Sequence, residues 1–321
     1  MRAQIAIACV LLCTTAAAEI PPEPNLVTNG VWLIPGRMLP RRQPDGNTIV
    51  FAAPQGLIVM DTGRHPWHRQ AILDFAKAQG KPIAAIVNSH WHLDHVSGNP
   101  DLKRAYPALK VYASNAIDGA LSGFLAKSAA DAQSYLDEGK LPPETAEDVR
   151  NDIATTRNGQ ALRPDVVVDR SATRDIAGKR LAVNLAPNAA TDGDVWVYDP
   201  ATRIAASGDL ITLPAPFLDT ACPAGWSKAL GDIDKTRFTT ILPGHGGAMS
   251  HAQFRAYRSA FDALIACSAS SRDANECAAE WTKAVATLPG AGPDAKAQGM
   301  TLYYVKDVLR AHNGKSAECK L

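Results

Sequence analysis

The fold of this chain is decided by the stretch Asn-Ser-His-Trp-His-Leu-Asp-His, residues 88–95. It follows the short, mostly apolar run 82–88, which predicts a strand buried on both faces. Alternate residues of an extended segment point the same way, so we expect His90 and His92 to converge on one cation. Asp94 and His95 follow on the loop and are placed to reach a second cation. Imidazole and carboxylate ligands favour zinc, with iron as the alternative.

The composition of the chain excludes several classes of protein. Of its 321 residues, 46% are hydrophobic and 20% are charged, which excludes intrinsic disorder and allows a large core. The net charge of +1 offers no electrostatic footprint for nucleic acid, so we expect no such partner. No apolar run reaches the roughly 18–20 residues of a membrane-spanning helix, so we expect no membrane span in the mature chain. A small-molecule substrate is the expected partner.

The N-terminal segment 1–18 has the parts of a secretory signal peptide. A basic residue, Arg2, precedes an apolar stretch and a run of small residues that ends at Ala18. A Pro-rich stretch then follows, which argues against the alternative of a buried N-terminal helix. We therefore expect cleavage after Ala18 and export, to a bacterial periplasm.

Cysteine usage agrees with an oxidising compartment. Without the two cysteines of the leader, four remain: Cys222, Cys267, Cys277 and Cys319. Two disulfides are expected, with three possible connectivities. Cys267 and Cys277 flank a turn-like segment between two helical patterns, so we favour that pair, which leaves Cys222 and Cys319 to tie the tail to the main domain. Four free buried thiols are the alternative.

The order of elements predicts one mixed α+β (α/β) domain with helical additions. After a linker at 19–29, we expect the main domain at 30–250, with a helical insertion at about 118–160, and a helical C-terminal extension at 251–321. The expected strands are 30–35, 48–53, 57–61, 82–88, 165–169, 173–177, 180–186, 194–198, 203–207 and 238–242, and the expected helices are 65–79, 250–269, 275–286 and 294–312.

The pattern His-x-His-x-Asp-His at 90–95 resembles the metal motif of the metallo-β-lactamase superfamily. Three further segments resemble that family in the same order along the chain. They are Asp-Thr-Gly at 61–63, Ser-Gly-Asp at 207–209 and Pro-Gly-His-Gly at 243–246. The resemblance implies a four-layer αββα sandwich with its metal site at one edge of the sheets. The leader, Trp91 and the 243–246 loop are also similar to periplasmic members associated with quinoprotein dehydrogenase systems.

The resemblance also implies a set of metal ligands. One site would use Asp94, His95 and His245 with Asp209 as a fourth group, and the other would use His90 and His92 with a share of Asp209. One ligand is missing, because Ala190 stands where the family places a third His. Asn188 is the nearest substitute, but its register is off by two. We therefore expect one firmly bound zinc and a second that is weak or absent.

The activity implied by the resemblance is that of an exported metal-dependent hydrolase. A metal-bound hydroxide would attack an ester, thioester, amide or lactam carbonyl. Asp94 would ligate the metal, orient the nucleophile and take its proton. Asp61 is a candidate to hold a ligand His in the right tautomer, with a plain turn residue as the alternative.

Two other functions remain open. A β-lactamase is favoured by export, although the bridging carboxylate Asp209 resembles the general hydrolases and thioesterases of the superfamily more closely. A non-catalytic binding or accessory protein, which kept the scaffold and lost turnover through Ala190, is the alternative from a different class. We expect surface or supporting roles for His65 and His68, packing for Trp91, and a lid over the site for the helical insertion.

Overall fold

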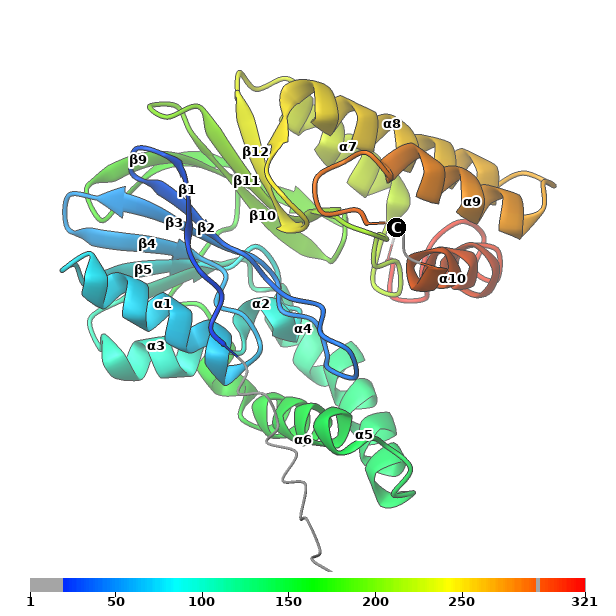
Figure 1. Ribbon diagram of the computed structural model, residues 1–321, viewed down its shortest axis with the longest axis horizontal. Coiled ribbons are helices and arrows are strands. Elements are labelled where there is room, and N and C mark those ends of the chain that lie inside the picture. Colours follow the sequence, from blue (N-terminus) through cyan, green and yellow to red (C-terminus); the bar gives the residue numbers. More distant parts are fainter. Residues whose placement is uncertain (1–19, 293–294, 321) are drawn as a thin grey trace, which may run out of the picture.

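The computed structural model describes residues 20–292 and 295–320, in which two β-sheets pack face to face between helices (Figure 1). The αββα sandwich predicted from the sequence is confirmed. The expected leader lies outside the described residues. No helix in the described part of the chain has the length and apolar character that crossing a membrane requires.

The first sheet follows the order of the chain, β1-β2-β3-β4-β5-β6-β7. Its strands pair antiparallel as far as β4 and parallel from β4 onward. The bounds are β1 Asn25–Thr28, β2 Val31–Ile34, β3 Thr48–Ala53, β4 Gly56–Met60, β5 Ile83–Val87, β6 Lys110–Ala113 and β7 Val166–Val167.

The second sheet has the order β13-β12-β11-β10-β9-β8. All of its neighbours are antiparallel except β11 and β12, which run parallel. The bounds are β8 Ala172–Ile176, β9 Lys179–Pro187, β10 Gly193–Asp199, β11 Ile204–Thr212, β12 Thr240–His245 and β13 Met249–Ser250.

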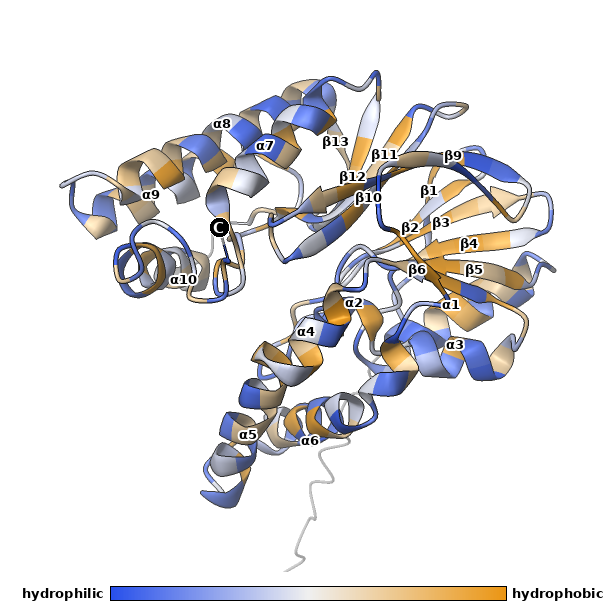
Figure 2. Cartoon of the chain, turned by 180° about the vertical axis from the view of Figure 1, so that it is seen from behind, coloured by the Kyte–Doolittle hydropathy of each residue, from blue (hydrophilic) through white to orange (hydrophobic). Residues whose placement is uncertain are grey.

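Central strands are hydrophobic on both faces because each face meets a different core. In β4, Ile58 and Met60 pack between the two sheets, whereas Leu57 and Val59 pack against the outer helices. This is the pattern of a strand covered on both sides, and Figure 2 shows the resulting hydrophobic character of the sheets. The expectation that 82–88 forms such a strand is confirmed by β5.

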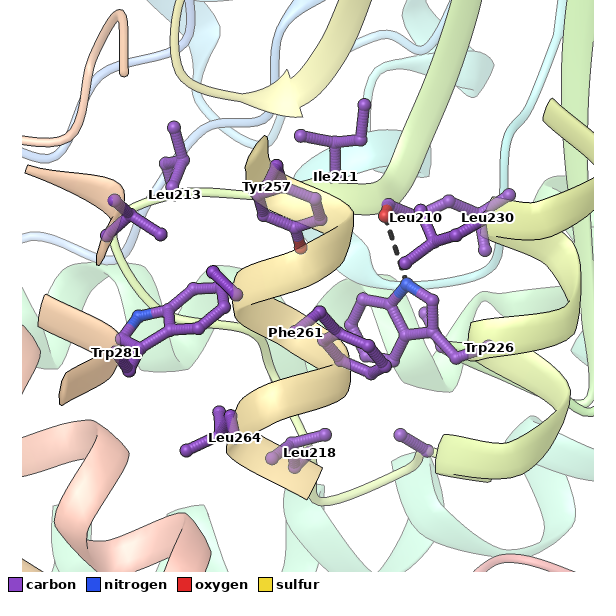
Figure 3. Packing of buried hydrophobic residues seen from close by; sticks show 14 of the residues in the cluster. Leu210, Ile211, Leu213, Leu218, Trp226, Leu230, Tyr257, Phe261, Leu264 and Trp281 are labelled. Carbon is purple, nitrogen blue, oxygen red and sulfur yellow. Dashed lines mark hydrogen bonds between the residues drawn. The ribbon is translucent and has the colours of Figure 1, made fainter. Parts of the chain in front are cut away.

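Helices cover the outer face of each sheet. On the first sheet these are α1 (Pro66–Ala78) and α3 (Asn99–Ala105), and on the second α7 (Pro223–Asp234) and α8 (His251–Ser268). Figure 3 shows the aromatic core under α7 and α8, where the Trp226 indole donates a hydrogen bond of 3.0 Å to the carbonyl of Leu210. This bond fixes α7 against β11, which carries Asp209 towards the site.

The helical additions also form as predicted. The insertion holds α4 (Ala116–Ser122), α5 (Phe124–Asp137) and α6 (Pro143–Arg157), which extend away from the sheets in Figure 1. The C-terminal part holds α9 (Ala274–Val285), α10 (Ala295–Tyr303) and the π-helix η2 (Tyr304–Leu309). Both favoured disulfides, Cys267–Cys277 and Cys222–Cys319, are present.

The structure contains a few elements that the sequence does not predict, namely β1, β6, β13, α2 (Leu93–Val96), α3 and α7. Asp94 and His95, which the sequence predicts on a loop, lie in α2. The strands β1, β6 and β13 are four residues or shorter. Such short strands carry little alternation of their own, and pairing with a neighbour stabilises them. Helix α7 is different, because it has Pro223 in its first turn and buries Trp226, Leu230 and Ile233 on one face. That spacing is a helix signal that the sequence analysis leaves unused.

Candidate metal centre

The chemistry-bearing residues lie at the carboxyl ends of four strands. Asp61 follows β4, the 88–95 segment follows β5, Asp209 lies near the end of β11, and His245 ends β12. Both β4–β5 and β11–β12 are parallel pairs, so their carboxyl ends reach the same edge of the sandwich. All six residues predicted as metal ligands meet at this edge, where they form two groups of three.

The first group consists of Asp94, His95 and His245. Nε2 of His245 lies 3.0 Å from Oδ2 of Asp94 and 3.3 Å from Nε2 of His95. Asp209 adjoins this group, with its Oδ1 3.2 Å from Nε2 of His95 and 3.7 Å from Nε2 of His245. Two imidazoles and two carboxylates therefore present ligand atoms to one point.

The second group consists of His90, His92 and Asp209. Nε2 of His90 lies 2.8 Å from Nδ1 of His92 and 3.8 Å from Oδ2 of Asp209. Asp209 therefore turns one oxygen towards each group. Asp209 thus lies between the two groups, where a bridging carboxylate would lie.

The donor set fits a cation on two observations. Ring nitrogens face one another in both groups, and two lone pairs at such distances need a proton or a metal between them. Oδ1 of Asp209 is buried and accepts no hydrogen bond from the described residues. Imidazole and carboxylate are the ligands that zinc prefers, so the residues fit that metal.

The electrostatics of the centre also favour positive charge. Burial acts to lower the pKa of His95, but the charges of Asp209, Asp94 and Asp61 outweigh it and hold that pKa well above its usual value. Burial lowers the pKa of His90 well below the usual range, and the neighbouring His95 adds to the effect. The carboxylates therefore attract a cation to the centre while the imidazole of His90 keeps its lone pair.

His95 and His90 each have the second ring nitrogen held by a hydrogen bond. The carboxylate of Asp61 accepts from Nδ1 of His95 at 2.9 Å, which leaves Nε2 for the centre. Asp61 also accepts from the backbone N–H and the hydroxyl of Ser89, at 2.7 and 2.6 Å, and Ser89 contacts Nδ1 of His90 at 2.9 Å. The predicted contact between Asp61 and a histidine of the centre is thus present, and Ser89 links Asp61 to a second histidine, His90.

Two glycines make room for the ligands. A Cβ at Gly244 would lie 2.0 Å from Oδ1 of Asp209, and one at Gly46 would lie 2.3 Å from Cε1 of His95. Any side chain at either position would displace the carboxylate or the ring. The close approach of Asp209 therefore explains why the residue before His245 is a glycine.

The position of the missing ligand is occupied differently. The hydroxyl of Thr220 donates to the carbonyl of Ala190 at 2.9 Å and lies 3.1 Å from Nε2 of His92. Since the hydroxyl proton goes to that carbonyl, Nε2–H of His92 donates to Thr220 and Nδ1 faces the centre. Four residues after Ala190, at the start of β10, Oδ1 of Asp194 is buried without a partner among the described residues, and burial raises the pKa of this carboxyl well above its usual value.

A cavity of about 330 Å³ opens onto the centre. Asp94, Asp209 and His245 line one part of it, and α5 and α6 of the insertion line another. Arg64, on the loop after β4, also reaches it, with Nη2 3.7 Å from Oδ1 of Asp94 and Nη1 paired with Asp152. The insertion therefore borders the candidate site, as the sequence predicts for a lid.

The remaining histidines of the N-terminal half lie outside the two groups. His65 and His68 are both buried, so of the expected surface or supporting roles only the supporting role remains. His65 pairs with Asp45 and Asp148, and His68 contacts the hydroxyl of Thr48 at 2.8 Å. Both support the structure around the site. Trp91 packs among apolar residues, as expected.

Sequence reasoning misses Thr220, Ser89 and Arg64. Ser89 lies inside the quoted motif, and Arg64 directly follows the Asp-Thr-Gly turn, so position alone could have drawn attention to both. Thr220 lies in a loop that belongs to no motif. Only the fold brings it to His92.

Comparison with known proteins identifies the family. The family model described as the metallo-beta-lactamase superfamily matches residues 41–266, which is well over half of the chain. The match extends from the loop before β3 into α8, so it includes every residue of the two ligand groups.

Three curated relatives match shorter segments. The chain is 44% identical over 50 residues to a linear primary-alkylsulfatase of a Pseudomonas species, 40% over 58 residues to a hydroxyacylglutathione hydrolase of Gloeobacter violaceus, and 39% over 66 residues to an atrochrysone carboxyl ACP thioesterase of Passalora fulva. These segments are 15%, 18% and 20% of this chain, and they span only 10%, 23% and 20% of the relatives.

Solved structures share the fold. A metallo-beta-lactamase from Pontibacter korlensis has a TM-score of 0.55 at 19% identity, over 75% of this chain and 98% of that one. A double mutant of a sec-alkyl sulfatase has a TM-score of 0.61 at 19% identity, over 88% of this chain and 50% of that one. At these identities the likeness concerns the fold alone.

Proposed function

Because this chain belongs to the metallo-beta-lactamase superfamily, we propose that it is an exported, zinc-dependent hydrolase of carboxylic esters or thioesters. The observation that carries the proposal is the convergence of Asp94, His95, His245 and Asp209 at the mouth of a cavity. Members of the superfamily are hydrolases, and a thioesterase and a hydroxyacylglutathione hydrolase are among the relatives.

We propose the six converging side chains as the metal ligands. Asp94, His95, His245 and Asp209 would hold one zinc ion firmly, since together they offer four ligand atoms. His90 and His92, with the second oxygen of Asp209, would hold another weakly, because Ala190 supplies no third imidazole. When bound, zinc lowers the pKa of a water ligand to about 7 and polarises a carbonyl oxygen.

The residues of the chain orient the reaction. The carboxylate of Asp94 faces both the centre and the cavity, so it is placed to align the attacking water and to take its proton. Asp61 and Ser89 keep His95 and His90 in the tautomers that ligation needs. Burial of the whole cluster excludes competing solvent and strengthens these interactions.

Hydrolysis of alkyl sulfate esters is the second candidate. It is favoured by the alkylsulfatase segment of 44% identity and by the apolar lining of the cavity. A β-lactamase and a non-catalytic accessory protein are the remaining alternatives. Each of these functions predicts turnover of a different substrate, or of none.

The proposal is tested with zinc-loaded protein and a panel of p-nitrophenyl esters, an acyl thioester, an alkyl sulfate and a chromogenic lactam. We expect turnover of the esters or the thioester that a chelator abolishes and added zinc restores. His245→Ala should lower kcat/KM by about 100-fold or more, as expected for loss of a metal ligand. His312→Ala, which alters an exposed histidine, is the matched control.

Other outcomes would reject the proposal. Turnover of the lactam alone would assign a β-lactamase, and turnover of the sulfate alone would assign a sulfatase. If the folded, zinc-loaded protein hydrolyses none of the panel, the accessory role is the better account. Circular dichroism shows whether His245→Ala loses activity because a ligand is missing or because the variant no longer folds.

A further inference from the structure

We infer that the cavity beside the metal centre selects substrates whose acyl group is an uncharged, extended hydrocarbon chain. The inference rests on the proposed function, because it names the substrate class for that same site. It is carried by the arrangement of α5 and α6 and by the pairing of the cationic side chain in the cavity wall.

One face of α5 and one face of α6 line the cavity. On α5 the lining residues follow the three- and four-residue spacing of a single helix face, and they are Phe124, Leu125, Ser128, Ala129 and Ala132. On α6 they are Val149, Asp152, Ile153 and Thr156, with the same spacing. Two such faces form a trough that follows the helices for about 10 Å.

The trough is mostly apolar and has room in it. Small side chains at 128, 129 and 132 leave space along α5, where larger residues would fill the cavity. Leu213, Ala215 and Phe217, from the loop after β11, supply apolar lining from the second sheet. An aliphatic chain placed between these walls loses water on several sides, which favours binding in proportion to the area buried.

Charge in the cavity argues against an anionic chain. Arg64 is the one arginine or lysine among the described residues that line the cavity. Its guanidinium pairs with Asp152, lies 3.7 Å from Asp94, and donates from Nε to the carbonyl of Pro44 at 3.1 Å. Asp152 already balances its charge, so a carboxylate or sulfate on the substrate would find no free cation in this wall.

The reacting end of the substrate is fixed by the same geometry. Asp94, Asp209 and His245 line the cavity together with the two helices. A scissile carbonyl at the centre therefore places its hydrocarbon chain along α5 and α6. The insertion thus acts as the specificity element of the site.

The first test is the chain-length profile of the zinc-loaded protein with p-nitrophenyl acetate, butyrate, hexanoate and octanoate. Each methylene that enters the trough should raise kcat/KM about fourfold, since burial of one methylene contributes about that factor. A flat profile, or faster turnover of octyl sulfate than of the octanoate ester, would overturn the inference.

The second test narrows the trough. Ala132→Phe should lower the ratio of octanoate to acetate kcat/KM at least tenfold, because the new ring occupies the chain's place. Ala130→Phe is the matched control, since Ala130 lies on the same helix but is exposed and does not line the cavity. An unchanged ratio in Ala132→Phe would contradict the inference.

A binding measurement separates this inference from the proposed function. Octanamide, which is uncharged, is titrated into the zinc-loaded protein by calorimetry. Binding that Ala132→Phe weakens and Ala130→Phe preserves supports the trough even if no ester is hydrolysed, and in that case the proposed function alone fails. If esters are hydrolysed but octanamide does not bind, the proposed function stands and the trough is rejected.

Discussion

At the residue scale, the site depends on the side chains that orient the imidazoles. Asp61 holds His95, and Thr220 holds His92 while donating to the carbonyl of Ala190. The second contact matters because the weaker zinc site proposed at His90 and His92 would have no third imidazole to compensate for a misplaced ring. Thr220 therefore acts through His92 as a positioning residue.

We predict that Thr220→Val lowers the affinity of the weaker zinc site about 10- to 100-fold. Valine keeps the shape of threonine but offers no acceptor to Nε2–H of His92, so the ring loses its fixed tautomer. Thr220→Ser, which keeps the hydroxyl, should retain most of the affinity. Competition with a chromogenic chelator measures both variants.

Thr282→Val serves as the control, since Thr282 bonds only within α9. If Thr220→Val binds zinc as the unaltered protein does, the positioning role is wrong. If Thr220→Ser loses as much zinc affinity as Thr220→Val, the loss comes from altered packing and not from the hydroxyl.

At the element scale, buried ionic contacts attach α6 to the main domain. Nδ1 of His65 lies 2.8 Å from Oδ2 of Asp45, and its Nε2 lies 3.2 Å from Oδ1 of Asp148 on α6. Arg42 also pairs with Asp148, at 2.7 Å, and Trp67 stacks on His65 with ring centroids 4.0 Å apart. One imidazole thus joins the β2–β3 loop, the start of α1 and the insertion.

We predict that α6 is held most tightly at intermediate pH. Burial acts to lower the pKa of His65, but Asp148 and Asp45 outweigh it and raise that pKa, so this stabilisation is lost as the pH rises through the folded value. Burial acts to raise the pKa values of Asp45 and Asp148, but other effects, led by hydrogen bonds from His65, outweigh it and lower both values. The stabilisation that these two carboxylates contribute is therefore lost as the pH falls through those values.

Amide hydrogen exchange of α6, corrected for the intrinsic rate, measures this dependence. His65→Gln should remove the alkaline loosening, whereas His251→Gln, which alters an ion pair on α8, should leave it in place. Protection of α6 that is constant from mildly acidic to alkaline pH would contradict the prediction.

The two disulfides should differ in their effect on stability. The Cys222–Cys319 bond joins residues 97 apart in sequence, and Cys267–Cys277 joins residues 10 apart. Since a longer loop restricts the unfolded chain more, serine pairs should lower the free energy of unfolding by about 4.7 and about 2.7 kcal/mol respectively. Urea unfolding measures both, and the reverse order would contradict the chain-entropy account.

At the scale of the whole molecule, the sequence predicts the sandwich and the convergence of the candidate ligands because both depend on local patterns. The 90–95 motif is contiguous and follows a strand that is apolar on both faces. Asp209 and His245 are remote in sequence, but each lies at a strand end with its own glycine-containing motif. The fold then brings these ends to one edge, as the family resemblance implies.

The parts that sequence could not supply depend on tertiary contacts. Thr220 has no motif, and its role follows from the loop that places it between His92 and Ala190. The faces of α5 and α6 are visible as helical spacing, yet only the packed structure shows that they border the centre. The burial of His65 likewise follows from α6 lying over it, which no local pattern indicates.

The central claim is that the chain holds one zinc firmly and lacks a ligand for the second. Elemental analysis of zinc per chain after exhaustive dialysis tests it most directly, with Ala190→His measured beside the unaltered protein. We predict about one zinc in the unaltered protein and about two in Ala190→His, because the new imidazole completes the second group. Two firmly retained zinc ions in the unaltered protein, or none in either, would contradict the account.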